Sequence, residues 1–364
     1  MSTYGTKLAE IFSAKLLKHF YEQSITNDLV NRDYEGEIKG KASIVNIPSL
    51  ARLGWNDYDG ENMIADDLEE TVAQLKTSWK KSYYFKKKTI TELESFIKDP
   101  EKKTIPQLGS ELKKLVDTYL LGFWGKVAAG QRVGTDYATG TIAIDASGNV
   151  TGTSTVFTSE MIGKPFKATG HTMWYRVKTF IDTTHIVVEK DIDDEDASYD
   201  GGVISAGAAY IIQAVSKINV TKATLLFKIA QLGKILDEAE VPDEGRCIFV
   251  PPAFSMYIPL ADGVNVAVPK HYEALTKRGF ITELGGFKIF KTNRVSGDNV
   301  NGFHILATHP KWLTFAEAMS ESKVEDDIIG NFGSAYKGLF VAGAKVADER
   351  RKFAAELFCT VSDS

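Results

Sequence analysis

Ile105–Gly130, with the sequence IPQLGSELKKLVDTYLLGFWGKVAAG, determines how the rest of the chain can be arranged. Eight apolar side chains recur along it at helical spacing, namely Leu108, Leu112, Leu115, Val116, Tyr119, Leu120, Phe123 and Val127. Lys113, Lys114 and Asp117 fall on the opposite side. Pro106 lies where the first turn of a helix tolerates proline. The pattern predicts one amphipathic helix about 35 Å long, the spine helix.

The chain as a whole has the composition of a folded, water-soluble protein of more than one domain. Its 364 residues exceed the size at which a single core keeps growing, so two or three domains are expected. Hydrophobic residues make up 43% of the chain and charged residues 25%, with a mean hydropathy of -0.15. We expect no bilayer-spanning segment and no secretory signal, because no apolar run is long enough for either.

Charge and cysteine content narrow the possible partners and chemistry. The formal net charge of -5 gives no general attraction to nucleic acid, so any such contact would be local. Cys247 and Cys359 lie far apart and lack metal-ligand spacing, so we expect two buried thiols.

The first hundred residues predict an arm followed by a hairpin. Ala9–Val30 has the pattern of a short helix or an arm lying on another surface, and the following residues to Trp55 favour an extended segment. Lysines cluster with Trp79, Tyr83 and Tyr84, which on a nucleic-acid interpretation would stack on bases. The simpler interpretation pairs the lysines with acidic residues across a two-stranded hairpin; these are Glu61, Asp66, Asp67, Glu69 and Glu70. A long charged hairpin of this kind needs a neighbouring subunit.

Residues 134–212 predict a small all-β module, because β-branched and aromatic residues alternate between regularly spaced turns. Its expected core is Phe157, Phe166, Trp174, Tyr175, Val177, Phe180, Ile186 and Val188. The acidic run Asp191–Gly202 raises the hypothesis of a calcium site, but it lacks the spacing of a helix-loop-helix calcium loop. A solvated loop is the preferred interpretation.

Helix is predicted again at Asn219–Glu240, capped by Asn219 or Thr221. Its apolar stripe is Leu225, Ile229, Leu232, Leu236 and Ala239. Two helices on either side of a self-contained β module indicate an insertion into a parent domain. Beyond them we predict short strands at Arg246–Val250 and Phe287–Phe290.

No motif of catalysis or cofactor binding is present. The six histidines form no helical metal pair, and there is no dinucleotide, Walker or nucleophile-elbow motif. The prediction is a protein that is not an enzyme and has no cofactor and no metal.

Several segments together resemble the major capsid proteins of tailed bacteriophages with the Hong Kong 97 fold. They are KASIVNIPSLARLGW (41–55), SYYFKKKTITELES (82–95), the spine helix, VPDEGRCIFVPPAF (241–254), RGFITELGGFKIFKTNRV (278–295), His304–Ala307, KWLTFAEAM (311–319) and NFGSAYKGLFVAGAKVADE (331–349). These patterns are loose, and they cover roughly the whole chain outside the β module.

The resemblance implies an α+β chain with an N-arm, an E-loop, a P-domain holding the long spine helix, an A-domain and a small all-β insertion domain. The implied boundaries are 1–49 for the N-terminal arm, 50–90 for the extended E-loop hairpin, 91–133 for the P-domain with its spine helix, 134–213 for the inserted β-sandwich or barrel, 214–241 for a P-domain helix, 242–310 for the A-domain and 311–364 for the return strands.

The implied function is self-assembly into the icosahedral shell of a tailed double-stranded DNA phage, built in the host bacterial cytoplasm from hexameric and pentameric capsomers. Expected partners are other copies, portal, scaffolding and decoration proteins and nonspecifically held DNA, with no membrane. An arm and hairpin that cannot bury their own surface agree with this. The expected intersubunit contacts are Trp55, Tyr58, Trp79, Lys80, Tyr83, Tyr84, Phe12 and Phe20.

Three alternatives remain open from the sequence. An encapsulin-type nanocompartment shell shares the same parent fold. A glycan-binding adhesin would use Trp174, Tyr175 and His171 of the β module, although such aromatic residues are more often core. A hydrolase would need catalytic residues among the scattered carboxylates.

Overall fold

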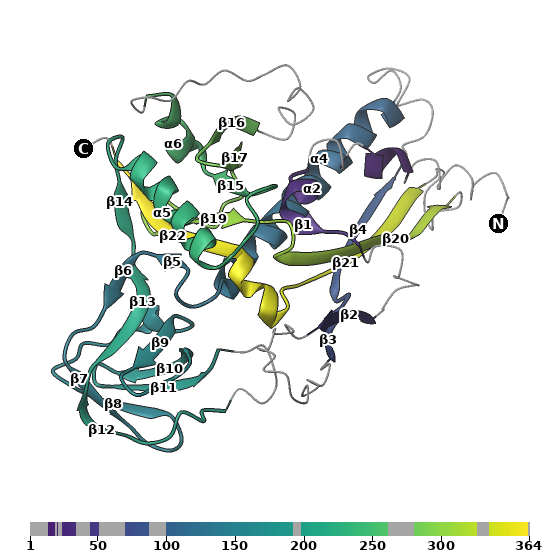
Figure 1. Ribbon diagram of the computed structural model, residues 1–364. Coiled ribbons are helices and arrows are strands. Elements are labelled where there is room, and N and C mark those ends of the chain that lie inside the picture. Colours follow the sequence, from purple (N-terminus) through teal and green to yellow (C-terminus); the bar gives the residue numbers. More distant parts are fainter. Residues whose placement is uncertain are drawn as a thin grey trace, which may run out of the picture. The chain divides into compact units, whose positions relative to one another are not determined.

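The computed structural model describes residues 14–18, 20, 24–33, 44–50, 70–86, 100–191, 198–260, 280–325 and 335–362 (Figure 1). The chain divides into two compact units. Unit 1 comprises Met1–Tyr21, Val30–Lys113 and Leu313–Ala347, and unit 2 comprises Glu22–Leu29, Lys114–Trp312 and Asp348–Ser364. Among the described residues, no helix is long and apolar enough to cross a membrane.

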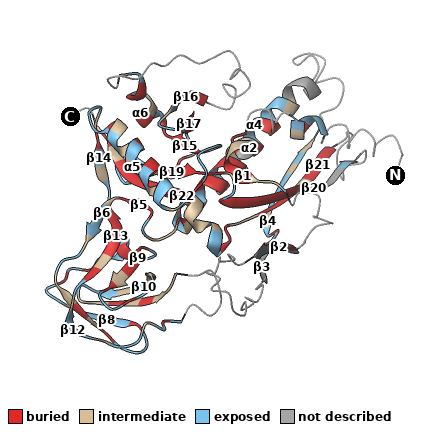
Figure 2. Cartoon of the chain, in the orientation of Figure 1, coloured by how far each residue is buried: buried red, intermediate tan, exposed pale blue. Residues whose placement is uncertain are grey.

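Unit 1 is built on a four-stranded sheet in the order β1-β20-β21-β4. Its strands are β1 (Val30–Asn31), β4 (Trp79–Lys86), β20 (Leu313–Glu325) and β21 (Ala335–Lys345). Phe315, Phe340 and Val341 are buried on the two long central strands; Figure 2 colours buried residues red. A separate antiparallel pair is formed by β2 (Ile44–Leu50) and β3 (Glu70–Lys76), which runs in register from Ile44↔Lys76 to Leu50↔Glu70.

The predicted pairing of the lysine-rich strand with the acidic segment is wrong. β4 pairs with β21, so that Lys80 lies opposite Val341 and Lys81 opposite Phe340. Aromatic packing explains the choice, because the ring of Phe85 stacks on Tyr336 at 5.3 Å. The hairpin strands are instead β2 and β3, while Glu61, Asp66, Asp67 and Glu69 lie outside the described residues.

The spine helix is confirmed, with shifted ends. Helix α4 spans Pro100–Leu121, about 33 Å, and continues as a 3-10 turn, η2 (Gly122–Lys126). Pro106 lies inside this helix and not in its first turn, because the helix begins six residues earlier at Pro100. Glycine has low helix propensity, and the α-helix ends where Gly122 begins the tighter turn.

The predicted faces of the spine helix are partly wrong. Val116 and Leu120 are buried as expected, but Leu115 is 44% exposed. Asp117, expected on the solvent side, is fully buried and accepts a 2.8 Å hydrogen bond from the hydroxyl of Ser24. Ser24 precedes the short helix α2 (Thr26–Leu29) of the same unit. A buried polar partner therefore overrides the amphipathic pattern at this position.

Unit 2 contains a main sheet in the order β14-β22-β19-β15-β17-β16, with helix α5 (Leu225–Glu238) packed along β22. The strands are β14 (Ile218–Val220), β15 (Cys247–Val250), β16 (Phe280–Leu284), β17 (Phe287–Lys291), β19 (Gly302–Thr308) and β22 (Ala354–Val361), with β5 (Arg132–Val133) and β18 (Gly297–Asp298) paired beside them. Short helices are α6 (Pro252–Ser255), η4 (Ile258–Leu260) and η6 (Asp348–Phe353).

The predicted strands near residues 246–250 and 287–290 and the apolar stripe of α5 are confirmed. Leu225, Ile229, Leu232 and Leu236 are buried in the core of the main sheet. The predicted helix cap is wrong: Asn219 belongs to β14, and the side chain of Thr221 makes no capping bond to α5.

Residues 135–216 form a second sheet of unit 2, here called the β module. Its strand order is β12-β7-β8-β11-β10-β9-β13-β6. The elements are β6 (Thr135–Tyr137), β7 (Thr141–Ile144), β8 (Asn149–Thr153), η3 (Ser159–Met161), β9 (Pro165–Ala168), β10 (Tyr175–Asp182), β11 (His185–Lys190), β12 (Ile204–Ala208) and β13 (Tyr210–Ser216).

The β module has a core of its own, which agrees with most of the predicted residues. Phe157, Phe166, Tyr175, Val177, Ile186 and Val188 are buried in it. Trp174 and Phe180 are only partly buried. Of the acidic run, residues 192–197 lie outside the described residues, and no cluster of three potential metal ligands occurs within the described ones.

Both cysteines are buried free thiols, as predicted. Burial raises the pKa of Cys247 and of Cys359 to about 12, so both thiols stay protonated and unreactive near neutral pH.

Candidate functional site

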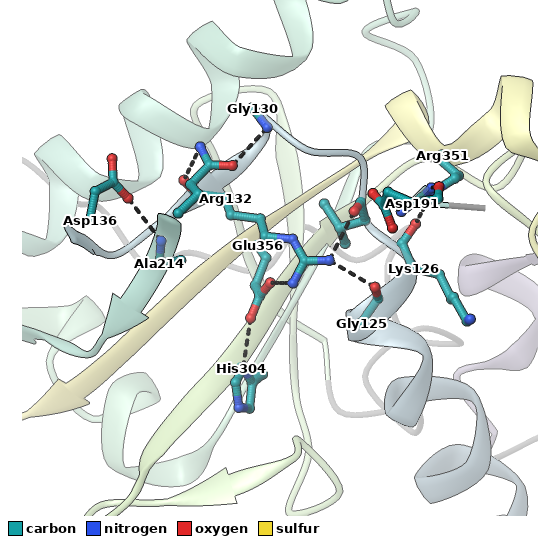
Figure 3. Close-up of polar contacts among 12 residues, drawn as sticks. Gly125, Lys126, Gly130, Arg132, Asp136, Asp191, Ala214, His304, Arg351 and Glu356 are labelled. Atoms are coloured by element: carbon teal, nitrogen blue, oxygen red, sulfur yellow. Dashed lines mark hydrogen bonds and ion pairs between the residues drawn. The ribbon is translucent and has the colours of Figure 1, made fainter. Parts of the chain in front are cut away.

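A buried charged network joins β5 to the main sheet of unit 2 (Figure 3). The guanidinium of Arg132 lies 3.1 Å from the carboxylate of Glu356 on β22, and it donates to the carbonyls of Gly125 and Val127. Glu356 also accepts a 2.6 Å hydrogen bond from Nδ1 of His304 on β19. Arg132 and Glu356 are almost completely shielded from water, with side-chain exposures of 2% and 0%.

The imidazole of His304 is held between two aromatic rings. It stacks on Trp124 of η2 with ring centroids 3.6 Å apart, and on Phe358 of β22 at 4.5 Å. The ammonium of Lys164, which precedes β9, lies over the rings of Trp124 and Phe358. The spine-helix extension, the main sheet and the β module therefore meet at one set of side chains.

The electrostatics of Glu356 follow from this arrangement. Burial alone raises the pKa of its carboxyl, but Arg132, His304 and Lys164 together outweigh burial and leave the pKa below its ordinary value of 4.5. Glu356 is consequently ionised at neutral pH. A buried ion pair of this kind fixes one geometry, since removing either partner leaves an uncompensated charge.

Further polar contacts join the β module to the rest of unit 2 and join its first strand to its last. Gln213 of β13 accepts a 2.7 Å bond from the backbone amide of Gly130, and the carboxylate of Asp136 accepts one from the amide of Ala214. Arg351 of η6 pairs at 2.8 Å with Asp191, directly after β11, and donates to the carbonyl of Lys126.

The residues predicted as intersubunit contacts fall into three groups. Phe12, Trp55 and Tyr58 lie outside the described residues. Phe20 is completely buried within its own chain. The remaining four lie on β4: Trp79, Lys80, Tyr83 and Tyr84.

The structure brings these four residues together on a strand at the end of the sheet order. Trp79 contacts Phe340 edge-on at 6.0 Å, and Tyr83 lies over Gly338, so both rings already have packing partners on β21. Lys80 and Tyr84 are exposed, Tyr84 by 55%. Within the described part of the chain, the outer edge of β4 has no paired strand. An edge of this kind can accept a further strand or another copy.

The sugar face considered for an adhesin is not supported by the geometry. Tyr175 and His171 are buried, and His171 bonds at 2.7 Å to the hydroxyl of Tyr199. Trp174 is partly buried and has Lys167 over its ring. The rings of His171, Tyr175 and Tyr199 pack against one another within the β module, so they do not form an open aromatic surface.

Sequence reasoning missed the buried network. One signal was present, because Glu356 interrupts the apolar run AAELFCTV of β22. A charged side chain in such a strand needs a partner. Arg132 lies 224 residues away in the chain, so its role was not visible without the fold.

The comparisons with known proteins concern the fold. No family model and no curated protein match the chain by sequence. A chain of the Mycobacterium phage Che8 structure is 16% identical with a TM-score of 0.51, covering 92% of this chain and 90% of that one. A chain of the capsid of Ralstonia phage GP4 is 10% identical with a TM-score of 0.50, covering 92% and 88%. The chain therefore has the fold of a phage capsid chain.

Proposed function

We propose that this chain is the major capsid protein of a tailed double-stranded DNA bacteriophage and self-assembles into its icosahedral shell. The observation that carries the proposal is the shared fold, which extends over 92% of this chain and 88% of the Ralstonia phage GP4 capsid chain. The role is structural and not enzymatic.

We assign the parts of the chain to the Hong Kong 97 pattern. The ladder of β2 and β3 with the residues between them is the E-loop, and α4 with the β20–β21 pair forms the P-domain. The main sheet of unit 2, with α5, is the A-domain. This differs from the sequence-based boundaries, which gave α5 to the P-domain and extended the E-loop to residue 90.

The β module is the insertion. Its first and last strands are neighbours, with Ser216 directly opposite Thr135 in the β6–β13 pair. The chain thus leaves and re-enters the parent domain at adjacent points, as an inserted domain requires. The module also buries its own core, so it does not depend on the parent for folding.

We infer self-association from the two-stranded β2–β3 ladder, whose small buried cluster includes Ala316 of β20, and from the edge strand β4. A two-stranded ladder is marginally stable alone, and an exposed edge invites pairing, so both are stabilised by neighbouring copies in a closed assembly. Hexameric and pentameric capsomers, host-cell assembly, portal and scaffolding partners and nonspecifically enclosed DNA belong to the same proposal.

Electron microscopy of the purified chain tests the proposal, with closed shells as the expected result. The matched variant replaces residues 51–69 by Asn-Gly, which closes the Leu50↔Glu70 pair with a two-residue turn and keeps the β2–β3 ladder. We expect it to give folded subunits without shells. A wild-type chain that remains monomeric under all assembly conditions contradicts the proposal. Normal shells from the variant would show that residues 51–69 are not needed for contacts between copies.

A further inference from the structure

A hollow of about 320 Å³ opens in unit 2 beside the buried network. Its walls come from η2, from the residues between η3 and β9, and from the facing strands β10 and β11. The volume is at the lower end of the range of small-ligand sites. The hollow is not part of the surface on which the assembly proposal rests.

Lys164 is the exceptional residue of this hollow. It lines the hollow and is only 7% exposed. Its ammonium lies 4.6 Å from the ring centroid of Phe358 and 5.6 Å from that of Trp124. Within the described part of the chain it makes no hydrogen bond and no ion pair, and burial lowers its pKa. Ring faces compensate a buried ammonium only in part, because they supply no hydrogen-bond acceptor of full negative charge.

The two acidic side chains that line the hollow, Glu189 and Asp191, are already paired. Glu189 accepts from Arg176 at 2.7 Å and lies 3.3 Å from Lys178. Asp191 is paired with Arg351. Lys164 is the most deeply buried lysine of the hollow; Glu356 and Glu160 favour its charged form electrostatically, but among the described residues neither forms an ion pair with it.

We propose that this hollow binds a carboxylate group, with Lys164 as the cation that pairs with it. The bound oxygens would complete the hydrogen bonding of the ammonium, and charge-assisted bonds in a shielded site are strong. Trp124 and Val177, which also line the hollow, suit the short hydrocarbon stem that carries a carboxylate.

The lining favours a carboxylate over a phosphate. One unmatched ammonium balances a single negative charge, whereas a phosphate near neutral pH carries up to two. Glu189 and Asp191 line the same hollow and disfavour a dianion more strongly than a monoanion. A small monoanion fits both the charge and the volume.

Ligand-observed NMR on the full chain, with butyrate as probe, tests the proposal. Butyramide provides the uncharged isostere and inorganic phosphate the competing anion. The test variant is Lys164→Met, which keeps an apolar stem against both rings. The control is Lys178→Met, whose side chain is 57% exposed and paired with Glu189. All variants are made in two parent chains, called hosts: the wild-type chain, and a chain in which Asp193, Asp194, Glu195 and Asp196 are changed to their amides. In the second host these acidic side chains, which follow Asp191 in the sequence, do not compete with butyrate for Lys164.

We expect butyrate to bind one or both hosts, butyramide and phosphate to bind about tenfold more weakly or not at all, and Lys164→Met to weaken butyrate binding about tenfold. Lys178→Met should change the affinity by less than about threefold. Equal binding of butyrate and butyramide, tighter binding of phosphate, no change in Lys164→Met, or no binding in either host overturns the proposal. Folding of Lys164→Met is checked by its thermal unfolding midpoint.

A final experiment distinguishes a carboxylate supplied by a neighbouring copy of the chain from a free carboxylic acid. Only this experiment rests on the proposed function. Butyrate that binds free subunits but not shells indicates an acidic side chain supplied by a neighbouring copy, whereas binding to both indicates a free carboxylic acid. Either result supports a carboxylate site. The titration of free subunits needs no shells, so failure of the assembly proposal and failure of the site are distinguished.

Discussion

At the scale of single residues, Glu356 is the centre of the buried charged network of unit 2. Its carboxylate is fully buried, and Arg132 and His304 are its ionic and hydrogen-bonding partners. A charge that is costly to bury is retained here at the meeting point of β5, β19 and β22. The network holds the start of the β module in one position relative to the main sheet.

Glu356→Gln should destabilise unit 2 at neutral pH by on the order of 3 kcal/mol, because Arg132 loses its buried counter-charge. The folded-state pKa of Glu356 is lowered from 4.5, so its contribution is complete above that pH and is lost as the pH falls through the lowered value. The difference between wild type and variant should therefore shrink in acid. Denaturant unfolding at pH 7 and at about pH 4 measures it.

Glu189→Gln is the control for this prediction. Its ion pair with Arg176 is partly exposed, with side-chain exposures of 13% and 26%. We expect an effect of no more than about 1 kcal/mol with little pH dependence of the difference. Equal losses from the two glutamate variants would show that the buried network has no special role.

Residue patterns predicted burial well where packing is apolar and poorly where it is polar. The stripe of α5 and most of the β-module core follow from spacing alone. Asp117 does not, because its burial depends on Ser24, a residue distant in sequence. The burial of Arg132 and Glu356 was not predicted for the same reason, because a sequence pattern cannot identify a partner that only the fold brings close.

At the scale of elements, β4 shows how a strand chooses its partner. Its sequence predicted a strand, and its charges suggested an acidic neighbour in the chain. Aromatic packing against β21 decided otherwise, because buried ring contacts stabilise more than exposed charge pairs. Element type was thus predictable from local sequence, while strand pairing depended on a segment about 250 residues later.

Gly338→Ala should weaken the β4–β21 pair. A Cβ at Gly338 would lie 2.4 Å from the ring of Tyr83, so that ring must move. The expected loss of stability is about 1–3 kcal/mol, measured by thermal unfolding. Gly122→Ala is the matched control, since a Cβ there meets nothing within 4 Å, and it should be neutral or slightly stabilising. A neutral Gly338→Ala would mean that Tyr83 does not pack as described.

Tyr84→Ser tests β4 as an assembly surface. Tyr84 is 55% exposed, so the change should alter subunit stability by less than about 0.5 kcal/mol while lowering the yield of shells. Met256→Ser, at a side chain 54% exposed in unit 2, is the control and should leave shell yield unchanged. Sedimentation of assembled particles measures the yield. Equal yields from wild type and both variants would remove Tyr84 from the set of contacts.

At the scale of the whole molecule, some parts of the chain bury a hydrophobic core of their own and others do not. The β module and the main sheet of unit 2 each bury a core of their own. The β2–β3 ladder has only a small cluster of Val45, Ile47 and Leu75 with Ala316 of β20. The length of the chain predicted more than one domain, and the order of its predicted helices and strands indicated the capsid fold. The division into two units was visible only in the structure.

The independence of the β module gives the last prediction. Residues 134–217, expressed alone, should fold as a monomer, because Thr135 and Ser216 are cross-strand neighbours and the core is complete without the parent. Near-ultraviolet circular dichroism and a cooperative thermal transition are the measurements. Within this fragment Lys164 loses Trp124 and Phe358 and is less buried, so Lys164→Met should change stability less in the fragment than in the full chain. A fragment that stays unfolded would contradict the independence of the module and would show that its folding requires contacts with the rest of unit 2.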